Sequence, residues 1–359
     1  MNNKLPYSEP NIVDLSKELV NKVLSKKIYD VEGTLTEGIE GKKRIIFFLL
    51  DGLGNHQLSQ NKGILFNNIK KEIRTTFPST TNVVLSSFCT ASMPREHGIL
   101  SYFMYDKDFG GIFNALVWNK IDENRKKGEN YLTTKTIWET FNDHKLFSTV
   151  LQPKDLSMTT LSKNIYRGAN IITYDSCKDL FIQLNERKNT LSKFTFVYYP
   201  PIDLAGHVYG SNSLEYSEEI KLFEENFEKF LPSSKEFTKI LTSDHGMVDI
   251  KQEKRIKVDS SNTLVRFFGD NRAVFINGDI DEAKKLLKTI PGEFIDQNRL
   301  NSLLGYGPKH PEYELRVPQH CFLPNQDFAV VPSHLNDTLI GYHGGQSDQE
   351  TLVPLIIYY

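Results

Sequence analysis

The sequence predicts an α/β fold built on a doubly wound, mostly parallel sheet, and three observations support this fold class. Unbroken apolar segments such as residues 45–50 are typical of strands buried on both faces of a parallel sheet. Segments with apolar residues at helical spacing alternate with these strands along the chain. Several strands end in Asp, which places carboxylates at the carboxyl edge of the sheet, where open α/β folds bind ligands.

The elements follow one another as this fold requires. Residues 13–26 predict an amphipathic helix near the start of the chain. Apolar segments, several rich in aromatic and β-branched residues, predict strands over residues 44–52, 147–153, 193–203 and 237–246. Helices are predicted over residues 136–144 and 214–231, and residues 341–359 end in a further apolar strand.

The texture of the sequence changes after residue 250. Residues 264–278 predict a hairpin with a Gly-Asp-Asn turn, residues 281–290 a short helix, and residues 291–335 are rich in Pro and Gly. We therefore expect residues 250–335 to form a small inserted α+β lobe. Residues 1–249 and 336–359 would then form the core domain.

Composition excludes several classes of protein. The chain of 359 residues carries 43 Lys and Arg against 45 Asp and Glu, which gives no indication of a nucleic-acid surface. No apolar run approaches the roughly 20 residues of a membrane span, and residues 1–15 lack the apolar core of a signal peptide. Cys89, Cys177 and Cys321 are scattered, as suits a reducing compartment. We expect a cytoplasmic protein, and the sequence does not indicate its oligomeric state.

Three acids and three histidines follow strand ends or lie in a Gly-rich turn, and all are expected at one edge of the sheet. They are Asp51, Asp203, His207, Asp244, His245 and His343. The spacing of Asp203 and His207 places both side chains on one face of a helical turn. Each residue alone would be a turn, capping or structural residue, but their joint occurrence predicts a metal site.

Six such ligands are too many for one tetrahedral ion, so they predict two divalent cations. Mixed Asp and His ligands favour zinc, with manganese or iron as second choices. Two divalent cations carry four positive charges and three carboxylates carry three negative ones, so the site is about one negative charge short of neutral. An anionic ligand would complete the balance. Paired metals of this kind act in phosphoryl transfer.

A hydroxyl nucleophile is predicted at the start of the helix after Pro78 and Ser79. A hydroxyl there lies in the field of the helix N-terminus, which stabilises developing negative charge. Thr80 or Thr81 could instead simply cap the helix.

Together these segments resemble the type I phosphodiesterase/nucleotide pyrophosphatase family of the alkaline phosphatase superfamily, and its prokaryotic soluble members in particular. The matching segments are LLDGLG, FPSTTNVVLSSFCTASMPREHGILSY, PPIDLAGHVYG, TSDHGM and HGGQSDQETLVPLI. The resemblance implies an alkaline phosphatase-like three-layer α/β/α sandwich. It also implies a hydrolase of phosphoric ester or diphosphate bonds with a phosphodiester or nucleotide as small-molecule substrate.

The resemblance also implies roles for individual residues. One zinc ion would be held by Asp51, Asp244 and His245, with Thr81 as the nucleophile on that ion. The other zinc ion would be held by Asp203, His207 and His343. A phospho-threonine intermediate would form and then be hydrolysed at the second ion. Thr81 is preferred to Thr80 by counting back from the family's Pro-x-x-His-Gly, in which His97 is expected to be structural.

One departure from the family concerns the substrate. Extracellular members place an Asn after the His-Gly to hold a phosphoryl oxygen, and the same count reaches Tyr102 here. Tyr102 is therefore a candidate substrate-binding residue, and Asn82, which directly follows Thr81, is another. The sulfatase pattern Cys/Ser-x-Pro-x-Arg is absent, which argues against sulfate esters. Aromatic residues over 101–130 either line the pocket or belong to the core: Tyr102, Phe103, Tyr105, Phe109, Phe113 and Trp118.

Alternatives to a phosphodiesterase remain on the same frame. They are a phosphomonoesterase, a phosphonate hydrolase, a phosphotransferase, and a metal-stabilised binding module without catalysis. A monoester carries one more negative charge than a diester, and the motif around Thr81 supplies no extra cation for it. The complete set of ligands argues against a non-enzyme.

Overall fold

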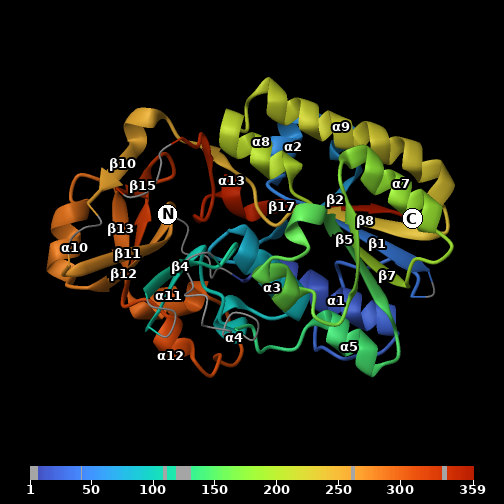
Figure 1. The fold of residues 1–359 in the computed structure, drawn as a ribbon, viewed down its shortest axis with the longest axis horizontal. Coiled ribbons are helices and arrows are strands. Elements are labelled where there is room, and N and C mark those ends of the chain that lie inside the picture. Colours follow the sequence, from blue (N-terminus) through green and yellow to red (C-terminus); the bar gives the residue numbers. More distant parts are fainter. Residues whose placement is uncertain (1–6, 42, 108–110, 119–130, 260–262, 334–337) are drawn as a thin grey trace.

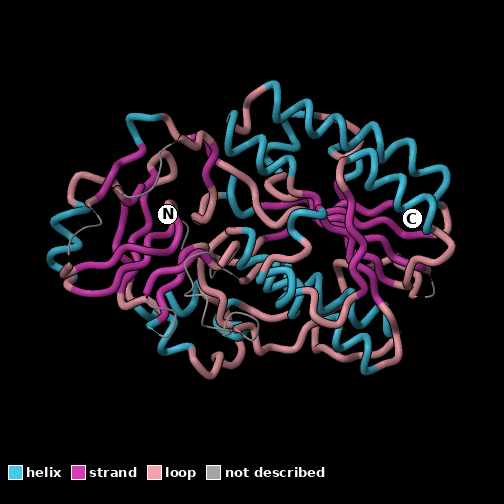
Figure 2. The backbone as a smooth tube through the Cα atoms, in the orientation of Figure 1, coloured by secondary structure: helices cyan, strands magenta, loops and turns pink. Residues whose placement is uncertain are grey.

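The chain folds around two sheets that lie at opposite ends of the molecule (Figure 1). The structure is a computed structural model that describes residues 7–41, 43–107, 111–118, 131–259, 263–333 and 338–359. Figure 2 shows the strands as two separate groups joined by loops, with helices around the larger group. Among the described helices, none is long and apolar enough to cross a membrane.

The larger sheet has seven strands in the order β2-β17-β8-β1-β7-β5-β6. Its strands are β1 (Arg44–Leu50), β2 (Ile69–Arg74), β5 (Ser148–Pro153), β6 (Asn170–Tyr174), β7 (Phe194–Tyr199), β8 (Phe237–Thr242) and β17 (Leu352–Tyr358). β1 pairs in parallel with β7 and β8, and β5 pairs in parallel with β6 and β7. Only β17 runs against its neighbours among these strands. The mostly parallel sheet predicted from the sequence is confirmed.

Strand β1 is apolar at every position from Ile45 to Leu50 because both of its faces are covered. Successive side chains of a strand point to opposite faces. Ile45, Phe47 and Leu49 join the core on one face, whereas Ile46, Phe48 and Leu50 join the core on the other. Helices cover both faces, so no face of β1 is left for polar residues.

Each face of the large sheet has its own set of helices (Figure 1). On one face lie α1 (Ile12–Leu24), α3 (Thr81–Thr90), α5 (Ile137–Asp143) and α6 (Thr160–Ile165), and on the other lie α2 (Asn55–Asn61), α7 (Cys177–Arg187), α8 (Pro201–Tyr209) and α9 (Leu214–Phe230). Aromatic rings join helices to strands: Phe47 stacks on Phe88 at 4.5 Å, and Phe48 meets Phe227 edge to face at 5.5 Å. The predicted three-layer α/β/α sandwich is confirmed.

Two predicted strands end earlier in the structure than in the sequence prediction. The strand predicted over 193–203 stops at Tyr199 because Pro200 and Pro201 cannot continue the ladder. Pro201 occupies the first turn of α8, where a missing N–H costs nothing. Asp203 therefore lies in a helix rather than at a strand end. The strand predicted over 237–246 likewise ends at Thr242.

The second sheet is antiparallel and has the strand order β13-β14-β12-β11-β3-β4. Its strands are β3 (Phe103–Asp106), β4 (Gly111–Asn114), β11 (Val265–Asp270), β12 (Ala273–Gly278), β13 (Gly292–Ile295) and β14 (His320–Pro324). The hairpin of β11 and β12 lies within the one predicted over 264–278, but its turn falls at Asn271 and Arg272. The loop expected over 101–130 contains β3 and β4, and Gly269 pairs with Phe103. Strands β3 and β4, which lie outside residues 250–335, thus complete this sheet. The predicted domain boundaries stay a prediction.

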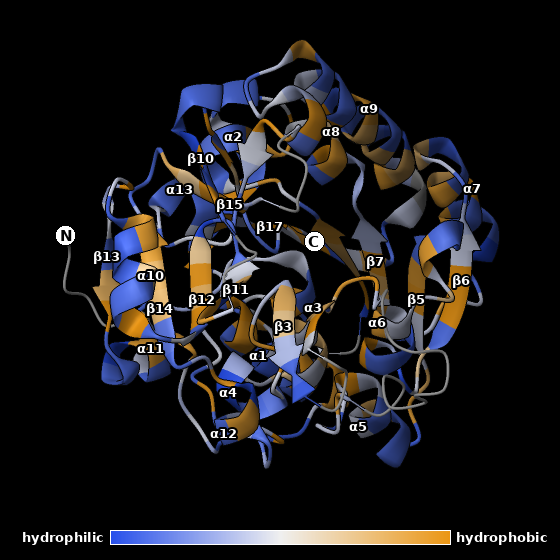
Figure 3. Cartoon of the chain, turned by 60° about the vertical axis from the view of Figure 1, so that its left-hand side comes forward, coloured by the Kyte–Doolittle hydropathy of each residue, from blue (hydrophilic) through white to orange (hydrophobic). Residues whose placement is uncertain are grey.

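Shorter elements surround the second sheet. They are α4 (Pro94–His97), α10 (Ile280–Leu287), α11 (Gln297–Leu303) and α12 (Tyr313–Arg316), with the strand pairs β10 (Arg255–Val258) with β15 (Ala329–Pro332), and β9 (Val248–Asp249) with β16 (Gly341–Tyr342). In Figure 3, β12 and β14 are coloured mainly hydrophobic, whereas α10 carries both hydrophilic and hydrophobic colours. Helix α10 buries Ala283 and Leu287, so its apolar residues still face the core of this lobe.

A buried ion pair ties the second sheet to the segment before β17. Arg272, in the β11–β12 turn, donates from Nε and Nη2 to the two carboxylate oxygens of Glu350 at 3.1 and 3.0 Å. Glu350 belongs to α13 (Asp348–Thr351) and also accepts the N–H of Gly345 at 2.9 Å. Both charged side chains are almost fully buried. Each charge therefore depends on the other for its solvation.

We expect Glu350→Ala to lower the free energy of unfolding by about 3–5 kcal/mol, because it leaves the Arg272 charge buried without its partner. Urea denaturation measures this change. The control is Asp143→Ala, which breaks the exposed pair between Asp143 and Lys135 and should cost only a small fraction of that amount. Equal effects of the two substitutions would show that the buried pair contributes nothing beyond a surface pair.

The same pair gives stability a dependence on pH. Burial opposes ionisation of Glu350, but Arg272, the Ser347 hydroxyl and the Gly345 N–H outweigh it and hold its pKa below the usual value. The stabilisation is therefore complete above the carboxyl pKa of the unfolded chain, about 4.3, and is lost as pH falls through the folded value. Glu350→Gln should flatten this acid limb in urea titrations between about pH 3 and 6.

Candidate active site

All six predicted metal ligands lie at the carboxyl edge of the large sheet. Asp51 follows β1 directly, and Asp244 and His245 follow β8, its neighbour in the sheet. Asp203 and His207 lie four residues apart on α8, which follows β7 on the other side of β1. His343 follows β16. The structure therefore brings together residues that are spread over almost 300 positions of the sequence.

The first group consists of Asp51, Asp244 and His245, whose ligand atoms lie within 4.8 Å of one another. His245 Nε2 is 3.4 Å from Asp51 Oδ1 and 3.5 Å from Asp244 Oδ2. All three side chains are buried. Asp244 Oδ1 accepts the N–H groups of His245 and Gly52, which leaves Oδ2 directed at the group.

The second group is built around His343. His343 Nε2 is 3.1 Å from His207 Nε2, and His207 Nε2 is 3.4 Å from Asp203 Oδ2. Asp203, His245 and His343 also have ligand atoms within 4.8 Å of one another, and the rings of His245 and His343 stack at 3.7 Å. The two groups thus meet at His245. Asp203 and His207 lie on one face of a helix, as their spacing predicts.

Each of the three imidazoles is held by its Nδ1 atom. His207 Nδ1 is 2.8 Å from the carbonyl of Gly341, His245 Nδ1 is 3.1 Å from that of Gly246, and His343 Nδ1 is 2.9 Å from that of Ser79. A carbonyl only accepts, so each Nδ1 carries the proton and each Nε2 keeps its lone pair. This is the arrangement in which imidazole binds a metal ion.

The electrostatics of the site disfavour a proton on His343 and raise the pKa of two of the carboxyl groups. Burial raises the pKa of Asp51 well above its usual value, and the nearby charges of Asp244 and Asp203 raise it further. Burial also raises the pKa of Asp203, although His207 and His245 act against it. The pKa of His343 is lowered well below its usual value by burial and by the two other imidazoles. Neutral imidazoles beside crowded carboxylates form a donor set that a divalent cation would stabilise.

Two buried carboxylate oxygens support the same conclusion. Asp203 Oδ1 and Asp244 Oδ2 have no hydrogen-bond partner among the described residues. A buried carboxylate oxygen without a partner is costly unless a charge lies beside it. The residues therefore fit divalent cations, and the O and N donors suit zinc as well as manganese or iron.

Thr81 lies beside the first group, at the first residue of α3. Its Oγ1 is 3.2 Å from His245 Nε2 and 3.5 Å from Asp51 Oδ1. Thr80 occupies the N-cap position, but its side chain makes no capping hydrogen bond. Of the two candidate nucleophiles, only Thr81 is placed within hydrogen-bond reach of both a predicted carboxylate and a predicted imidazole ligand.

The predicted substrate residues differ in exposure. Tyr102 is half-buried beside β3, whereas Asn82 is fully buried and donates its amide to the Ser101 carbonyl at 2.9 Å. Phe113 and Trp118 are buried, with ring centroids 5.1 Å apart, so they belong to the core. Phe103 and Tyr105 are half-buried in β3, and Phe109 lies outside the described residues.

Sequence reasoning missed residues that orient the ligands. The Tyr198 hydroxyl donates to Asp51 Oδ2, and Ser243 Oγ donates to the His245 carbonyl at 2.7 Å. Ser79 Oγ donates to the Gly345 carbonyl and accepts the Gly344 N–H, which holds the loop of His343. Tyr198 stands opposite Leu49 in the register of β7 and β1, so only the pairing of these two strands identifies it as a neighbour of Asp51.

His97 has the structural role that the sequence predicts. It is fully buried, its Nδ1 accepts the Ile99 N–H at 3.1 Å, and its Nε2 is 2.9 Å from Ser87 Oγ. Burial is the main reason why its pKa falls to about 3. His97 therefore fixes the end of α3 and takes no part in the two ligand groups.

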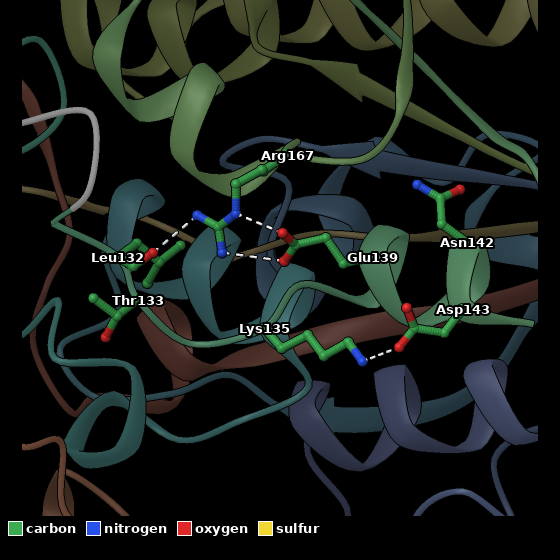
Figure 4. A pocket seen from close by; sticks show the side chains of 7 residues that line it. All are labelled: Leu132, Thr133, Lys135, Glu139, Asn142, Asp143 and Arg167. Carbon is green, nitrogen blue, oxygen red and sulfur yellow. Dashed lines mark hydrogen bonds and ion pairs between the residues drawn. The ribbon is translucent and has the colours of Figure 1, made fainter.

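A surface pocket beside α5 contains none of the predicted site residues (Figure 4). Its charged side chains are paired with one another: Arg167 with Glu139 at 2.8 Å, and Lys135 with Asp143. Arg167 also donates to the carbonyls of Leu132 and Thr134. These charged groups are satisfied within the protein, and none of them belongs to the two ligand groups.

The comparison with protein families gives one match. Residues 45–279 match the family model described as type I phosphodiesterase/nucleotide pyrophosphatase, which confirms the resemblance drawn from the motifs. The matched segment contains five of the six predicted ligands, and His343 lies beyond it. No curated protein sequence matches the chain.

Solved structures with the same fold are distant in sequence. Murine ectonucleotide pyrophosphatase/phosphodiesterase 5, solved as an inactive threonine-to-alanine variant in complex with AMP, is 15% identical with a TM-score of 0.69, over 88% of this chain and 87% of that one. The human protein is 15% identical with a TM-score of 0.68, over 88% of both chains. Phosphonoacetate hydrolase from Sinorhizobium meliloti 1021, in complex with phosphonoacetate, is 15% identical with a TM-score of 0.63, over 88% and 90%.

We expect Asp244→Asn and His343→Gln each to reduce bound divalent metal, because each removes a donor from a different group. Metal content per chain after dialysis against a weak chelator measures the loss, which should reach about tenfold in affinity. The control is His56→Gln, which changes an exposed histidine outside both groups. Unchanged metal content in both site variants would contradict the predicted ligand sets.

Proposed function

The chain belongs to the type I phosphodiesterase/nucleotide pyrophosphatase family, and on that premise we propose that it is a two-metal phosphodiesterase with Thr81 as its nucleophile. Members of this family are metal-dependent hydrolases of phosphoric ester and diphosphate bonds, and the chain is a hydrolase of that class. The observation that carries the finer proposal is the position of Thr81 Oγ1, between His245 Nε2 and Asp51 Oδ1 at the start of α3.

The residues suggest a reaction in two displacements. Thr81 Oγ attacks phosphorus, its proton passes to a neighbouring acceptor, and the bond from phosphorus to the leaving oxygen breaks. Water then attacks the phospho-threonine, which releases the phosphoryl group and restores the hydroxyl. Two divalent cations, once bound by the two ligand groups, would lower the pKa of the hydroxyl and balance the charge of the transferred group.

The remaining residues of the site act on geometry. Thr81 begins α3, so its hydroxyl lies in the positive field of the helix N-terminus, which favours negative charge there. The Tyr198 hydroxyl fixes the rotamer of Asp51. Ser79 directly precedes the two threonines, and its carbonyl accepts a hydrogen bond from His343 Nδ1. The nucleophile and the second ligand group therefore keep a fixed separation, which in-line attack requires.

The substrate that we propose is a small phosphodiester or a nucleotide. The resemblance of fold to a protein solved with AMP supports this choice. Phosphonate hydrolysis is the second candidate, because a phosphonoacetate hydrolase shares the fold at a TM-score of 0.63. Turnover of bis-p-nitrophenyl phosphate, dinucleotides, nucleoside triphosphates and phosphonoacetate by the zinc-loaded protein distinguishes the two.

We expect Thr81→Ala to reduce turnover of bis-p-nitrophenyl phosphate at least about a thousandfold while bound zinc stays near its wild-type level. The hydroxyl is the attacking group, whereas Asp51, Asp244 and His245 remain to hold metal. Steady-state rates and metal content on the same samples measure the two effects.

Two further variants make this result specific. Thr81→Ser keeps a hydroxyl and should retain part of the activity, and Thr80→Val should stay close to the wild type. If Thr80→Val were inactive and Thr81→Ala active, Thr80 would be the nucleophile. If Thr81→Ala kept full activity along with Thr80→Val, water would attack directly.

A further inference from the structure

Asp270 is a carboxylate that the second sheet presents to the edge of the active site. It is the last residue of β11, at the tip of the β11–β12 hairpin. Its Oδ2 accepts the backbone N–H of Tyr102 at 3.3 Å. Its Cβ lies so close to Gly344 that a Cβ added to this glycine would be 2.9 Å away. Gly344 has φ of 106°, so glycine is needed there for both reasons.

The neighbours of Asp270 adjoin residues of the proposed site. Gly344 follows the predicted ligand His343, and Tyr102 is a candidate substrate-binding residue. Thr80, which precedes the proposed nucleophile, also lies near Asp270, although its hydroxyl does not reach hydrogen-bond geometry. Burial raises the pKa of Tyr102, and the charges of Asp270 and Asp203 raise it further. Tyr102 therefore lies within electrostatic reach of both Asp270 and the second ligand group.

The charge of Asp270 is not neutralised by the protein. Within the described part of the chain, no lysine, arginine or histidine forms an ion pair with it. Arg272, two residues along, is engaged by both oxygens of Glu350 and by the carbonyls of Asn325 and Phe328. Burial raises the pKa of Asp270 to about 7, against the lowering effects of the Tyr102 N–H and of Thr80. Above this pKa the carboxylate carries a negative charge, which is unfavourable beside a highly charged anion.

We propose that Asp270 sets an upper limit on the charge of the bound phosphoryl group and so selects singly charged diesters over doubly charged monoesters. This inference rests on the proposed function of the same site. A fixed carboxylate repels a dianion more than a monoanion by one further unit of charge, and a partly buried position screens this repulsion poorly. Specificity of this kind arises from a group that is unfavourable to the competitor.

The test is Asp270→Asn, which removes the charge while an amide oxygen can still accept the Tyr102 N–H. Asp270→Ser is a second variant that removes the charge with a smaller side chain. The matched control is Asp279→Asn, the same chemical change at an exposed N-cap of α10 in the same lobe. Calorimetry at pH 8 measures the affinity of the zinc-loaded protein for inorganic phosphate, a dianion, and for dimethyl phosphate, a monoanion. Rates with p-nitrophenyl phosphate and bis-p-nitrophenyl phosphate are measured in parallel.

Both Asp270 variants should bind inorganic phosphate about tenfold more tightly than the wild type, with little change for dimethyl phosphate. The ratio of kcat/KM for the monoester to that for the diester should rise by a similar factor, and Asp279→Asn should change neither ratio. Unchanged ratios in both Asp270 variants would overturn the inference. Failure of the proposed function is a separate result, because it would appear as absence of diester turnover in the wild type while the binding ratios still report on Asp270.

Discussion

The architecture depends on one electrostatic constraint, which is that three carboxylates and three imidazoles share a corner of the protein in which three of them are buried and three half-buried. Asp244 and His245 have no exposed surface, and Asp51 has almost none. Without cations, such a group of acids repels itself in a medium that screens charge poorly. The fold accepts this cost at the carboxyl edge of the sheet, where the strands beneath are rigid and the residues above them are free to diverge.

Backbone carbonyls determine how the imidazoles respond to this constraint. The carbonyls of Gly341, Gly246 and Ser79 each accept from the Nδ1 atom of one histidine. Gly341 and Ser79 lie far along the chain from His207 and His343, so the orientation of these two imidazoles depends on tertiary structure, whereas Gly246 directly follows His245. Ser79 is the most informative of the three, because the same short segment leads into Thr81. A shift of the nucleophile would therefore disturb His343 as well.

The sequence allows the ligand set to be predicted because parallel strands end at a common edge. Asp51, Asp244 and His245 follow neighbouring strands, so their convergence follows from topology alone. Asp203 and His207 could be paired from their spacing, although the prolines at 200 and 201 should have moved them from a strand into a helix. These inferences need only local pattern and the rule for parallel sheets.

The contributions of the second sheet could not be predicted in the same way. Strand β3 joins β11 through a pairing of Gly269 with Phe103, and nothing in either segment specifies a partner so far along the chain. Tyr198 looks like one more aromatic residue of a buried strand until the register places it beside Asp51. Asp270 reads as a turn residue in the sequence, because only the docking of the hairpin tip brings it to Tyr102.

The hairpin tip carries two residues of opposite charge, Asp270 and Arg272, within three positions of the chain. Arg272 is neutralised by Glu350 and anchors the second sheet to the segment that carries Gly344 and Gly345. Asp270, on the same tip, faces the site without a cationic partner among the described residues. A carboxylate on a mobile loop would turn into water and discriminate weakly between anions, whereas a fixed one acts at full strength because no reorganisation is needed. The buried ion pair of Arg272 therefore provides the rigidity that allows the charge of Asp270 to act on a substrate.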